Sequence, residues 1–216
     1  MGADLFGSYV ATVLASMVLG NYLIRDMSVD SQFIDDFNNM GPILLPIVIA
    51  GVGILASIAG TFFVKISDND AKESKVQAAL DLGNWASIAI TLVFSYFLID
   101  WMLPETMNMM FFGEGYKEIS SMNVFGAACI GLAVGALISV VTAYYTSLGK
   151  KPVLDIVKNS STGAATNIIA GLAVGMKSTF LSVILFASAI YGSYTLAGFY
   201  GVCLLYTSPS PRDKHR

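Results

Sequence analysis

The sequence predicts an all-α fold, a polytopic transmembrane helical bundle of about five spans. Of its 216 residues, 55% are hydrophobic and only 12% are charged, and the mean hydropathy is +0.68. A soluble domain of this length carries about a quarter charged residues. The charges also cluster between long uncharged runs, and about 18 apolar residues suffice to cross a bilayer core. These features exclude an ordinary water-soluble enzyme, a nucleic-acid-binding protein and a disordered chain.

The predicted spans follow the uncharged runs. The second span opens with Gly41-Pro42, where proline is tolerated in the first turn of a helix. The third ends at the interfacial residue Trp101, just before the helix breaker Pro104. The five spans are predicted at about residues 2–24, 41–64, 82–103, 122–147 and 162–200.

Lys177 divides the last apolar stretch and allows two interpretations. In the first, residues 178–200 form a complete span, and Lys177 lies at the interface, where its aliphatic stem can snorkel. Residues 162–176 then form a helical extension that packs against other protein above the bilayer. In the second, Lys177 lies deep in the membrane, paired with a carboxylate from a helix outside this chain. We favour the first.

The two ends of the chain predict an internal piece of a larger protein. Met1 leads directly into an apolar helix, without the basic region and cleavage site of a signal peptide. The apolar pattern stops near Val202, and residues 203–216 resemble a translated sequencing-adapter read-through. We therefore expect residues 203–216 to be a non-native tail and leave them out of functional reasoning.

The lysines and arginines of the connections predict the orientation, because positively charged loops stay in the cytoplasm. Seven lie on one side and two on the other. Residues 65–81 and 148–161 are therefore predicted to be cytoplasmic loops, and the first span runs outward. The seven are Lys65, Lys72, Lys75, Lys150, Lys151, Lys158 and Lys177, and the two are Arg25 and Lys117.

Asp4 is the candidate functional residue. Burying a carboxylate in a membrane helix costs roughly 3 kcal/mol or more, so such a residue is a candidate for an ion or proton pathway. Ser8 follows one turn later, on the same side of the helix. Together the two side chains could coordinate Na⁺ or form two steps of a proton relay. The alternative is that Asp4 lies at a helix end and is solvated.

Other motifs favour structural roles. The repeats Gly131–Gly135 and Gly171–Gly175 have the small-xxx-small spacing that lets helices pack closely. Thr162–Asn167 opens the last helix with hydroxyls that could bind an anion, although a cap is the more common use. The single histidine, His215, lies near the C-terminus and excludes a histidine-based metal site. Two cysteines do not make a disulfide framework.

The ordered set of local strings resembles the membrane-bound, ion-pumping pyrophosphatases. The strings are Gly2–Tyr9, Tyr144–Ser147, Thr162–Asn167 and Gly171–Gly175, and the resemblance extends over about residues 1–202. It implies a homodimer of about sixteen helices per subunit in the lipid bilayer, expected in a bacterial inner membrane. It also implies that Mg²⁺ and many Asp and Lys side chains hold inorganic pyrophosphate, whose hydrolysis drives H⁺ or Na⁺ outward.

Under this resemblance the chain covers the second part of the sixth helix through the tenth, mostly in an outer ring. The magnesium-binding segments lie outside it, so no catalytic and no metal-binding residue is expected here. The resemblance leaves potassium dependence undetermined, because the residue that decides it also lies outside the chain. We therefore expect this chain alone to be inactive.

Carried over residue by residue, Asp4 matches the family's gate aspartate, and Ser8 matches a serine beside it that contributes to Na⁺ coordination in sodium pumps. Sodium pumps usually have a glutamate where this chain has Gly7, and plant-type proton pumps have one where it has Ala11. Some proton-pumping members supply this carboxylate from the fifth helix, so H⁺ is favoured over Na⁺. Ala143 also replaces a glutamate that many relatives have.

Two other functions fit the same physical features. A piece of a secondary transporter or channel, without enzymatic activity, would also show five spans and one intramembrane carboxylate. A scaffold or assembly subunit would tolerate replacement of Asp4 by asparagine.

Overall fold

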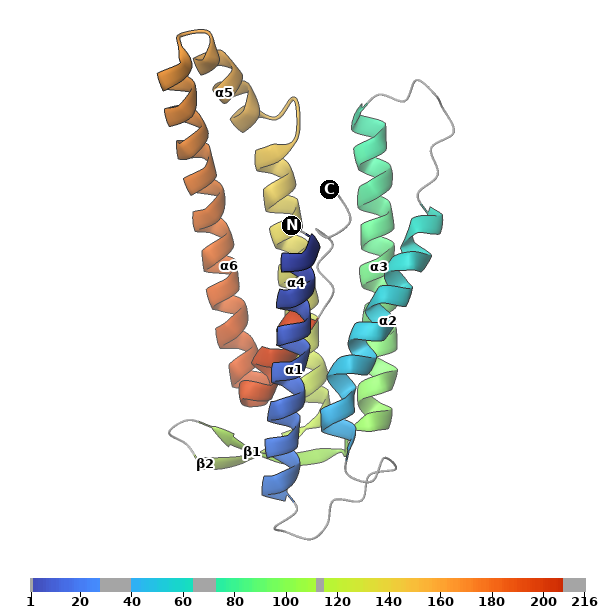
Figure 1. The fold of residues 1–216 in the computed structure, drawn as a ribbon. Coiled ribbons are helices and arrows are strands. Elements are labelled where there is room, and N and C mark those ends of the chain that lie inside the picture. The colour runs from blue at the N-terminus through green and yellow to red at the C-terminus, as the bar shows by residue number, and fades with distance from the viewer. Residues whose placement is uncertain (1, 28–39, 64–72, 112–114, 208–216) are drawn as a thin grey trace.

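The chain forms a bundle of long helices, closed at one end by a β-hairpin (Figure 1). The structure is a computed structural model and describes residues 2–27, 40–63, 73–111 and 115–207. We call the end with the β-hairpin the hairpin end, and the end with α5 the lysine end. The elements are α1 (Gly2–Met27), α2 (Gly41–Phe63), α3 (Glu73–Met102), β1 (Thr106–Phe111), β2 (Gly115–Ser120), α4 (Ser121–Thr146), α5 (Lys151–Ser160) and α6 (Ala164–Thr207).

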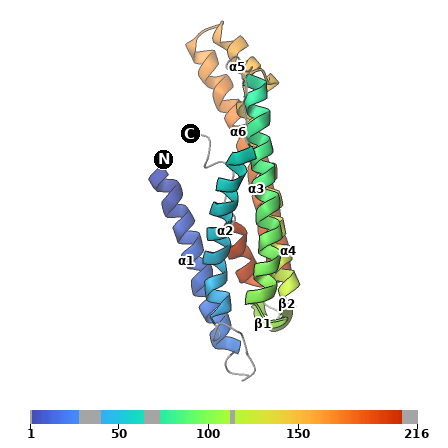
Figure 2. The same cartoon turned by 90° about the vertical axis from the view of Figure 1, so that its right-hand side faces the viewer.

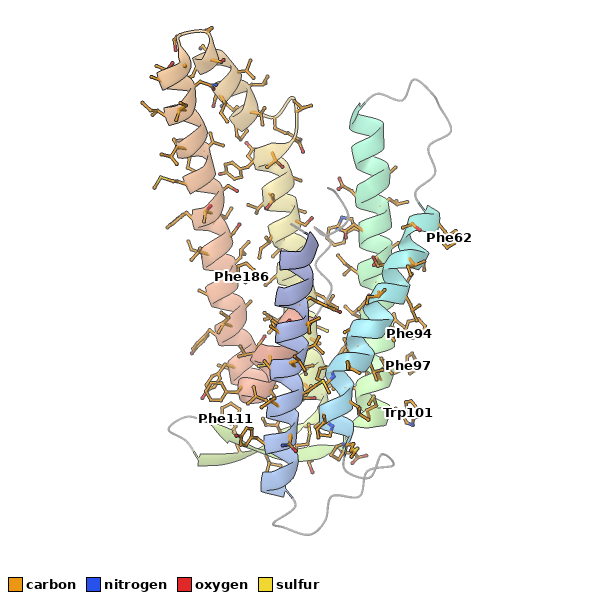
Figure 3. All side chains as sticks on the ribbon, in the orientation of Figure 1. Phe62, Phe94, Phe97, Trp101, Phe111 and Phe186 are labelled. Carbon is orange, nitrogen blue, oxygen red and sulfur yellow. The ribbon has the colours of Figure 1, made fainter. Side chains whose placement is uncertain are left out.

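The helices confirm the predicted polytopic, helical fold. Within the described ranges, four helical stretches are long and apolar enough to cross a membrane, and α1 adds a shorter apolar stretch, Tyr9–Tyr22. Phe94, Phe97 and Trp101 point outward from α3 (Figure 3). Each is more than half exposed. An apolar, aromatic outer face is what a lipid-facing helix requires, since lipid offers no hydrogen-bond partners.

The β-hairpin was not predicted from the sequence. Its strands pair antiparallel, with Met107 opposite Ile119 and Asn108 opposite Glu118. Met107 and Ile119 are buried, whereas Asn108 and Glu118 are exposed. This alternation covers the end of the bundle with an apolar face and turns the polar face outward.

The buried core lies at the hairpin end. Leu45 of α2, Ile99 of α3 and Val124 of α4 meet there next to the β-hairpin, together with Tyr200 of α6. The Tyr200 hydroxyl donates a hydrogen bond of 2.7 Å to the backbone carbonyl of Pro42 in the first turn of α2. Helices that are distant in sequence are therefore joined at this end.

Small residues bring α2 and α3 together. A Cβ placed on Gly60 would lie 2.8 Å from the carbonyl oxygen of Gly83 and 3.2 Å from the Cβ of Ser87. The buried face of α3 continues with Thr91, whose hydroxyl donates to the Ser87 carbonyl over 2.9 Å. Close backbone approach of this kind is the main packing device of membrane helices.

The chain reverses direction inside α6, at Ala197 and Gly198. Gly198 has a φ of 56°, in the left-handed region that favours glycine. Residues before the reversal run antiparallel to α4, and residues after it run parallel to α4: Gly192 lies against Ile130 and Leu196 against Gly126, whereas Gly201 lies against Ala127 and Leu205 against Gly131. The red end of α6 turns back between the other helices (Figure 1 and Figure 2).

This reversal corrects the predicted end of the last span. Residues 203–207 were set apart from the bundle, but they continue the returning segment of α6, and Leu204 and Leu205 are buried. Their apolar side chains pack against α4, which is why the helix extends past residue 200. Residues 208–216 lie outside the described residues, and their non-native origin stays a prediction.

The two predicted cytoplasmic loops also contain helix. Within 65–81, α3 begins at Glu73, because residues 73–81 are mostly good helix formers. Within 148–161, α5 occupies Lys151–Ser160 with Pro152 in its first turn. Its half-buried residues Val153 and Ile156 lie on the side that faces the bundle, and α5 packs against α4 and α6.

The hydroxyls of Thr162–Asn167 form the turn between α5 and α6. The Thr162 hydroxyl donates to the carbonyl of Asn159 over 2.7 Å, and the Thr166 hydroxyl donates to the carbonyl of Gly163 over 2.8 Å. Gly163 has a φ of 139°, which permits this sharp turn. Both bonds are donations to backbone carbonyls, so the hydroxyls close the turn between the two helices; neither is the predicted N-cap, in which a side-chain oxygen accepts from a backbone N–H.

The predicted small-xxx-small contacts are confirmed in part. A Cβ on Gly131 would lie 3.0 Å from Leu205, and Ala127 is fully buried. Near Gly135, Gly171 and Gly175, no atom of the described residues lies within 4 Å of such a Cβ. These three glycines therefore leave their faces open within the described part of the chain.

Replacing Gly60 by alanine is expected to destabilise the protein by about 1–3 kcal/mol, because the new methyl group would press on the Gly83 carbonyl. Thermal unfolding of the purified protein in detergent would measure the change. The matched control is Gly51→Ala, also in α2, whose Cβ meets no described atom within 4 Å. It should leave the melting temperature unchanged or raise it. Equal melting temperatures for both variants would contradict the close α2–α3 contact.

Candidate ion-translocation site

Asp4 and Ser8 lie in the first turns of α1, which is helical from Gly2 onward. One helical turn separates them, so they share a side of the helix. Their side chains lie outside those that the structure describes. The described residues further along α1 show which side of this helix packs against the other helices.

One side of α1 packs against the bundle. Val13, Ser16 and Gly20 are buried and are spaced by three and four residues, which is one face of a helix. The Ser16 hydroxyl donates to the Thr12 carbonyl over 2.9 Å, so its polar atom is satisfied within the helix. α2 and α6 are the main neighbours of α1.

The opposite side of α1 carries the candidate residues. At 3.6 residues per turn, positions 4, 7, 8 and 11 fall within an arc of about 100°, on the side away from the buried stripe. Ala15, Val18 and Tyr22 continue this side and are exposed. Among the described residues, nothing covers the side of α1 to which Asp4 belongs.

The positions of the two missing glutamates lie on this same side. Gly7 and Ala11 are both exposed, and a Cβ on Gly7 would meet no described atom within 4 Å. A side chain at either position would project beside Asp4 and Ser8. The resemblance assigns ion-site roles to these four positions, and their shared side of α1 is what such roles require.

The two ends of the bundle differ in charge. Lys150, Lys151 and Lys158 are exposed at the lysine end, whereas Asp100, Glu105 and Glu118 are exposed around the hairpin end. Lys65 and Lys72 lie outside the described residues. The side chain of Lys75, in the first turn of α3, is likewise not described.

The antiparallel register of α4 and α6 locates Lys177. Gly192 lies against Ile130 and Leu196 against Gly126, so continuing this register places Lys177 near the level of Tyr145, at the end of α4. Lysine and tyrosine at one level are typical of a membrane interface. From Lys177 to residue 196 the helix is about 29 Å long at 1.5 Å per residue, close to one bilayer core. This geometry supports the interfacial interpretation of Lys177.

A metal site is not formed by the described part of the chain. Within it, no three His, Cys, Asp or Glu residues gather closely enough to hold an ion. The carboxylates that it describes are instead dispersed over the two ends of the bundle, where water can solvate them.

The junction at Pro42 was not predicted from the sequence. The signal was present in the spacing, because Pro46 stands four residues after Pro42 inside α2 and leaves the Pro42 carbonyl without its usual helical donor. The partner could not be identified, because Tyr200 is 158 residues away in sequence.

Comparison with known proteins identifies the family. A family model described as inorganic H⁺ pyrophosphatase matches residues 1–208. The chain belongs to this family. The match includes residues 203–208, which agrees with the packing of residues 203–207 as part of α6.

Relatives of this chain include proteins named as proton pumps. A "K(+)-insensitive pyrophosphate-energized proton pump" of Caldanaerobacter subterraneus subsp. tengcongensis is 36% identical over 94% of this chain. A relative with the same name from Methanosarcina mazei is 34% identical over 92% of it. "Pyrophosphate-energized proton pump 2" of Rhizobium leguminosarum bv. trifolii is 39% identical over 76% of the chain and is matched over 73% of its own length.

The chain spans about a quarter of the length of the first two relatives, which are matched over 27% and 25% of their lengths.

Cysteine labelling tests the orientation of the bundle. With Cys129 and Cys203 replaced by serine, a cysteine introduced at the exposed Asn159 of α5 is expected to react with a membrane-impermeant maleimide in inside-out vesicles only. A cysteine at the exposed Asn108 of β1 is expected to react in intact cells only, because the lysine-rich end is predicted to stay in the cytoplasm. Labelling of both positions from the same side would contradict this orientation.

Proposed function

We propose that the protein to which this chain belongs couples the hydrolysis of inorganic pyrophosphate to phosphate with the translocation of H⁺ out of the cytoplasm. The observation that carries the proposal is the family match over residues 1–208, with relatives named as pyrophosphate-energized proton pumps. In this proposal the described helices support the pump and supply part of the ion pathway. The chain by itself is not the catalytic unit.

Asp4 is the proposed gate of the ion pathway. A carboxylate in a membrane helix is charged only at a large cost unless ions or donors surround it, so its protonation state and its partners change together. It belongs to the side of α1 away from the packed stripe of Val13, Ser16 and Gly20. Helices outside the described residues can therefore approach it and move relative to it. Such movement would open or close the path of an ion.

We propose H⁺ as the transported ion, in preference to Na⁺. Gly7 stands where sodium pumps usually carry a glutamate, and the positions of Gly7 and Ala11 share a side with Asp4. Without a second carboxylate, α1 offers fewer oxygen ligands to Na⁺ than the same helix of the sodium pumps does. Ser8 then acts as a hydrogen-bonding neighbour of Asp4 rather than as a sodium ligand. The relatives named above as proton pumps agree with this preference.

Pyrophosphate and Mg²⁺ are proposed to bind outside this chain. The described residues do not fit a magnesium site, because no cluster of carboxylates gathers among them. Phosphoryl transfer requires metal-bound carboxylates to offset the charge of the substrate. We also propose that the active protein is a homodimer embedded in the bacterial inner membrane, and that it needs no K⁺, as the names of two relatives say of them.

Replacing Asp4 by asparagine in the full-length protein is expected to lower pyrophosphate-driven H⁺ uptake by about tenfold or more, since a neutral amide cannot exchange a proton. Inside-out vesicles with a pH-sensitive dye would measure the uptake, with and without Na⁺, K⁺ and a protonophore. The control is Asp155→Asn, the same change at an exposed position of α5. Unaltered uptake in Asp4→Asn would overturn the assignment of Asp4 as the gate, and Na⁺ uptake without primary acidification would overturn the choice of H⁺.

The isolated 216-residue chain is expected to release no phosphate from Mg²⁺-pyrophosphate, because the proposed binding segments lie outside it. A phosphate assay on the purified chain in detergent would test this, with the full-length protein as the positive control. Mg²⁺-dependent phosphate release by the chain alone would contradict the proposal that the pyrophosphate- and Mg²⁺-binding segments lie outside it. Absence of hydrolysis by the full-length protein as well would favour a non-enzymatic transporter or channel.

A further inference from the structure

The carbonyl of Pro42 lacks its usual helical partner. In an α-helix this oxygen would accept from the N–H of residue 46, but that residue is Pro46, which has none. Pro42 and Pro46 are both among the most deeply buried side chains. A buried backbone carbonyl away from water needs another donor.

Tyr200 supplies that donor. Its hydroxyl lies 2.7 Å from the Pro42 oxygen, and the side chain is 2% exposed. The tyrosine reaches this position because Gly198 reverses the chain and directs the returning segment of α6 toward the first turn of α2. The bond therefore joins two helices that are far apart in sequence at a point from which water is excluded.

The same carbonyl also contacts α1. A Cβ added to Gly20 would overlap the Pro42 oxygen and lie 3.0 Å from the backbone nitrogen of Ile43. The backbone of α1 thus lies directly on the peptide group that Tyr200 holds. Since Gly20 and Asp4 belong to one continuous helix, the position of this contact influences the tilt and height of α1 at Asp4.

We propose that Tyr200 is a positioning residue for ion translocation. Its hydroxyl fixes the Pro42 peptide, this peptide fixes the contact of α1 at Gly20, and α1 carries Asp4. Removing the hydroxyl leaves the buried carbonyl without its donor, and the first turn of α2 shifts to find another. The inference rests on the proposed function, because positioning matters only if Asp4 is the gate.

The test compares Tyr200→Phe with the matched control Tyr191→Phe, whose side chain on the same helix is 73% exposed. Both are made in the full-length protein in inside-out vesicles, where H⁺ uptake and phosphate release are measured together. Uptake per phosphate released is expected to fall about threefold in Tyr200→Phe, in the range for residues that couple sites without touching the ligands. It should not change in Tyr191→Phe. A merely structural role would lower both rates in parallel and leave this ratio unchanged.

A second substitution tests whether the effect passes through the Pro42 carbonyl. Pro46→Ala restores the N–H that can bond to this oxygen within α2. The double variant Tyr200→Phe/Pro46→Ala is therefore expected to recover most of the lost uptake per phosphate. A wild-type ratio in Tyr200→Phe, or a double variant as uncoupled as Tyr200→Phe alone, would overturn the proposal.

A distance measurement separates this proposal from the proposed function. Spin labels at the exposed positions Leu14 of α1 and Ile47 of α2, with the native cysteines replaced, would report the placement of α1 without pyrophosphate. The distance distribution is expected to shift or broaden in Tyr200→Phe only. If the wild type shows no pyrophosphate-driven uptake, the proposed function fails. The distance measurement then decides the positioning: an unchanged distribution would overturn it.

Discussion

The hydrogen bond from the Tyr200 hydroxyl to the Pro42 carbonyl is the contact on which the hairpin end of the bundle depends. Three features of the chain make it necessary and available. Pro46 removes the helical donor for this carbonyl, Gly198 turns the chain so that Tyr200 can reach it, and Gly20 has no side chain to hold α1 away. A buried polar group that is satisfied from a distant helix specifies one arrangement of its neighbours more sharply than apolar packing does.

Burial is distributed unevenly around this contact. The core lies against the β-hairpin, where α2, α3, α4 and the returning segment of α6 converge. Toward the lysine end, α6 has large exposed apolar side chains, such as Ile168, Leu172 and Met176. In a water-soluble protein such a surface would be an interaction site. With Lys177 at the membrane interface, these residues lie above the bilayer, where other protein is expected to cover them.

Burial is uneven around α1 as well, and this places the candidate site. The buried stripe of α1 is held at Gly20, whereas the side that includes Asp4 is left uncovered by the described residues. Periodicity in the sequence was sufficient to place Asp4 and Ser8 on one side of a helix. It could not show which side of that helix packs, because packing depends on α2 and α6, whose contacts with α1 are long-range in sequence.

The sequence by itself determined the membrane-spanning helical class, the approximate spans and the candidate residues, because hydropathy and helical periodicity are local properties of the chain. Only the tertiary structure revealed the β-hairpin, the α5 helix, the reversal at Gly198 and the inclusion of residues 203–207 in α6. The hairpin is stabilised by burial of Met107 and Ile119 against distant helices, and the Tyr200 hydroxyl donates its hydrogen bond to Pro42, 158 residues away. Such contacts join segments that no local pattern connects.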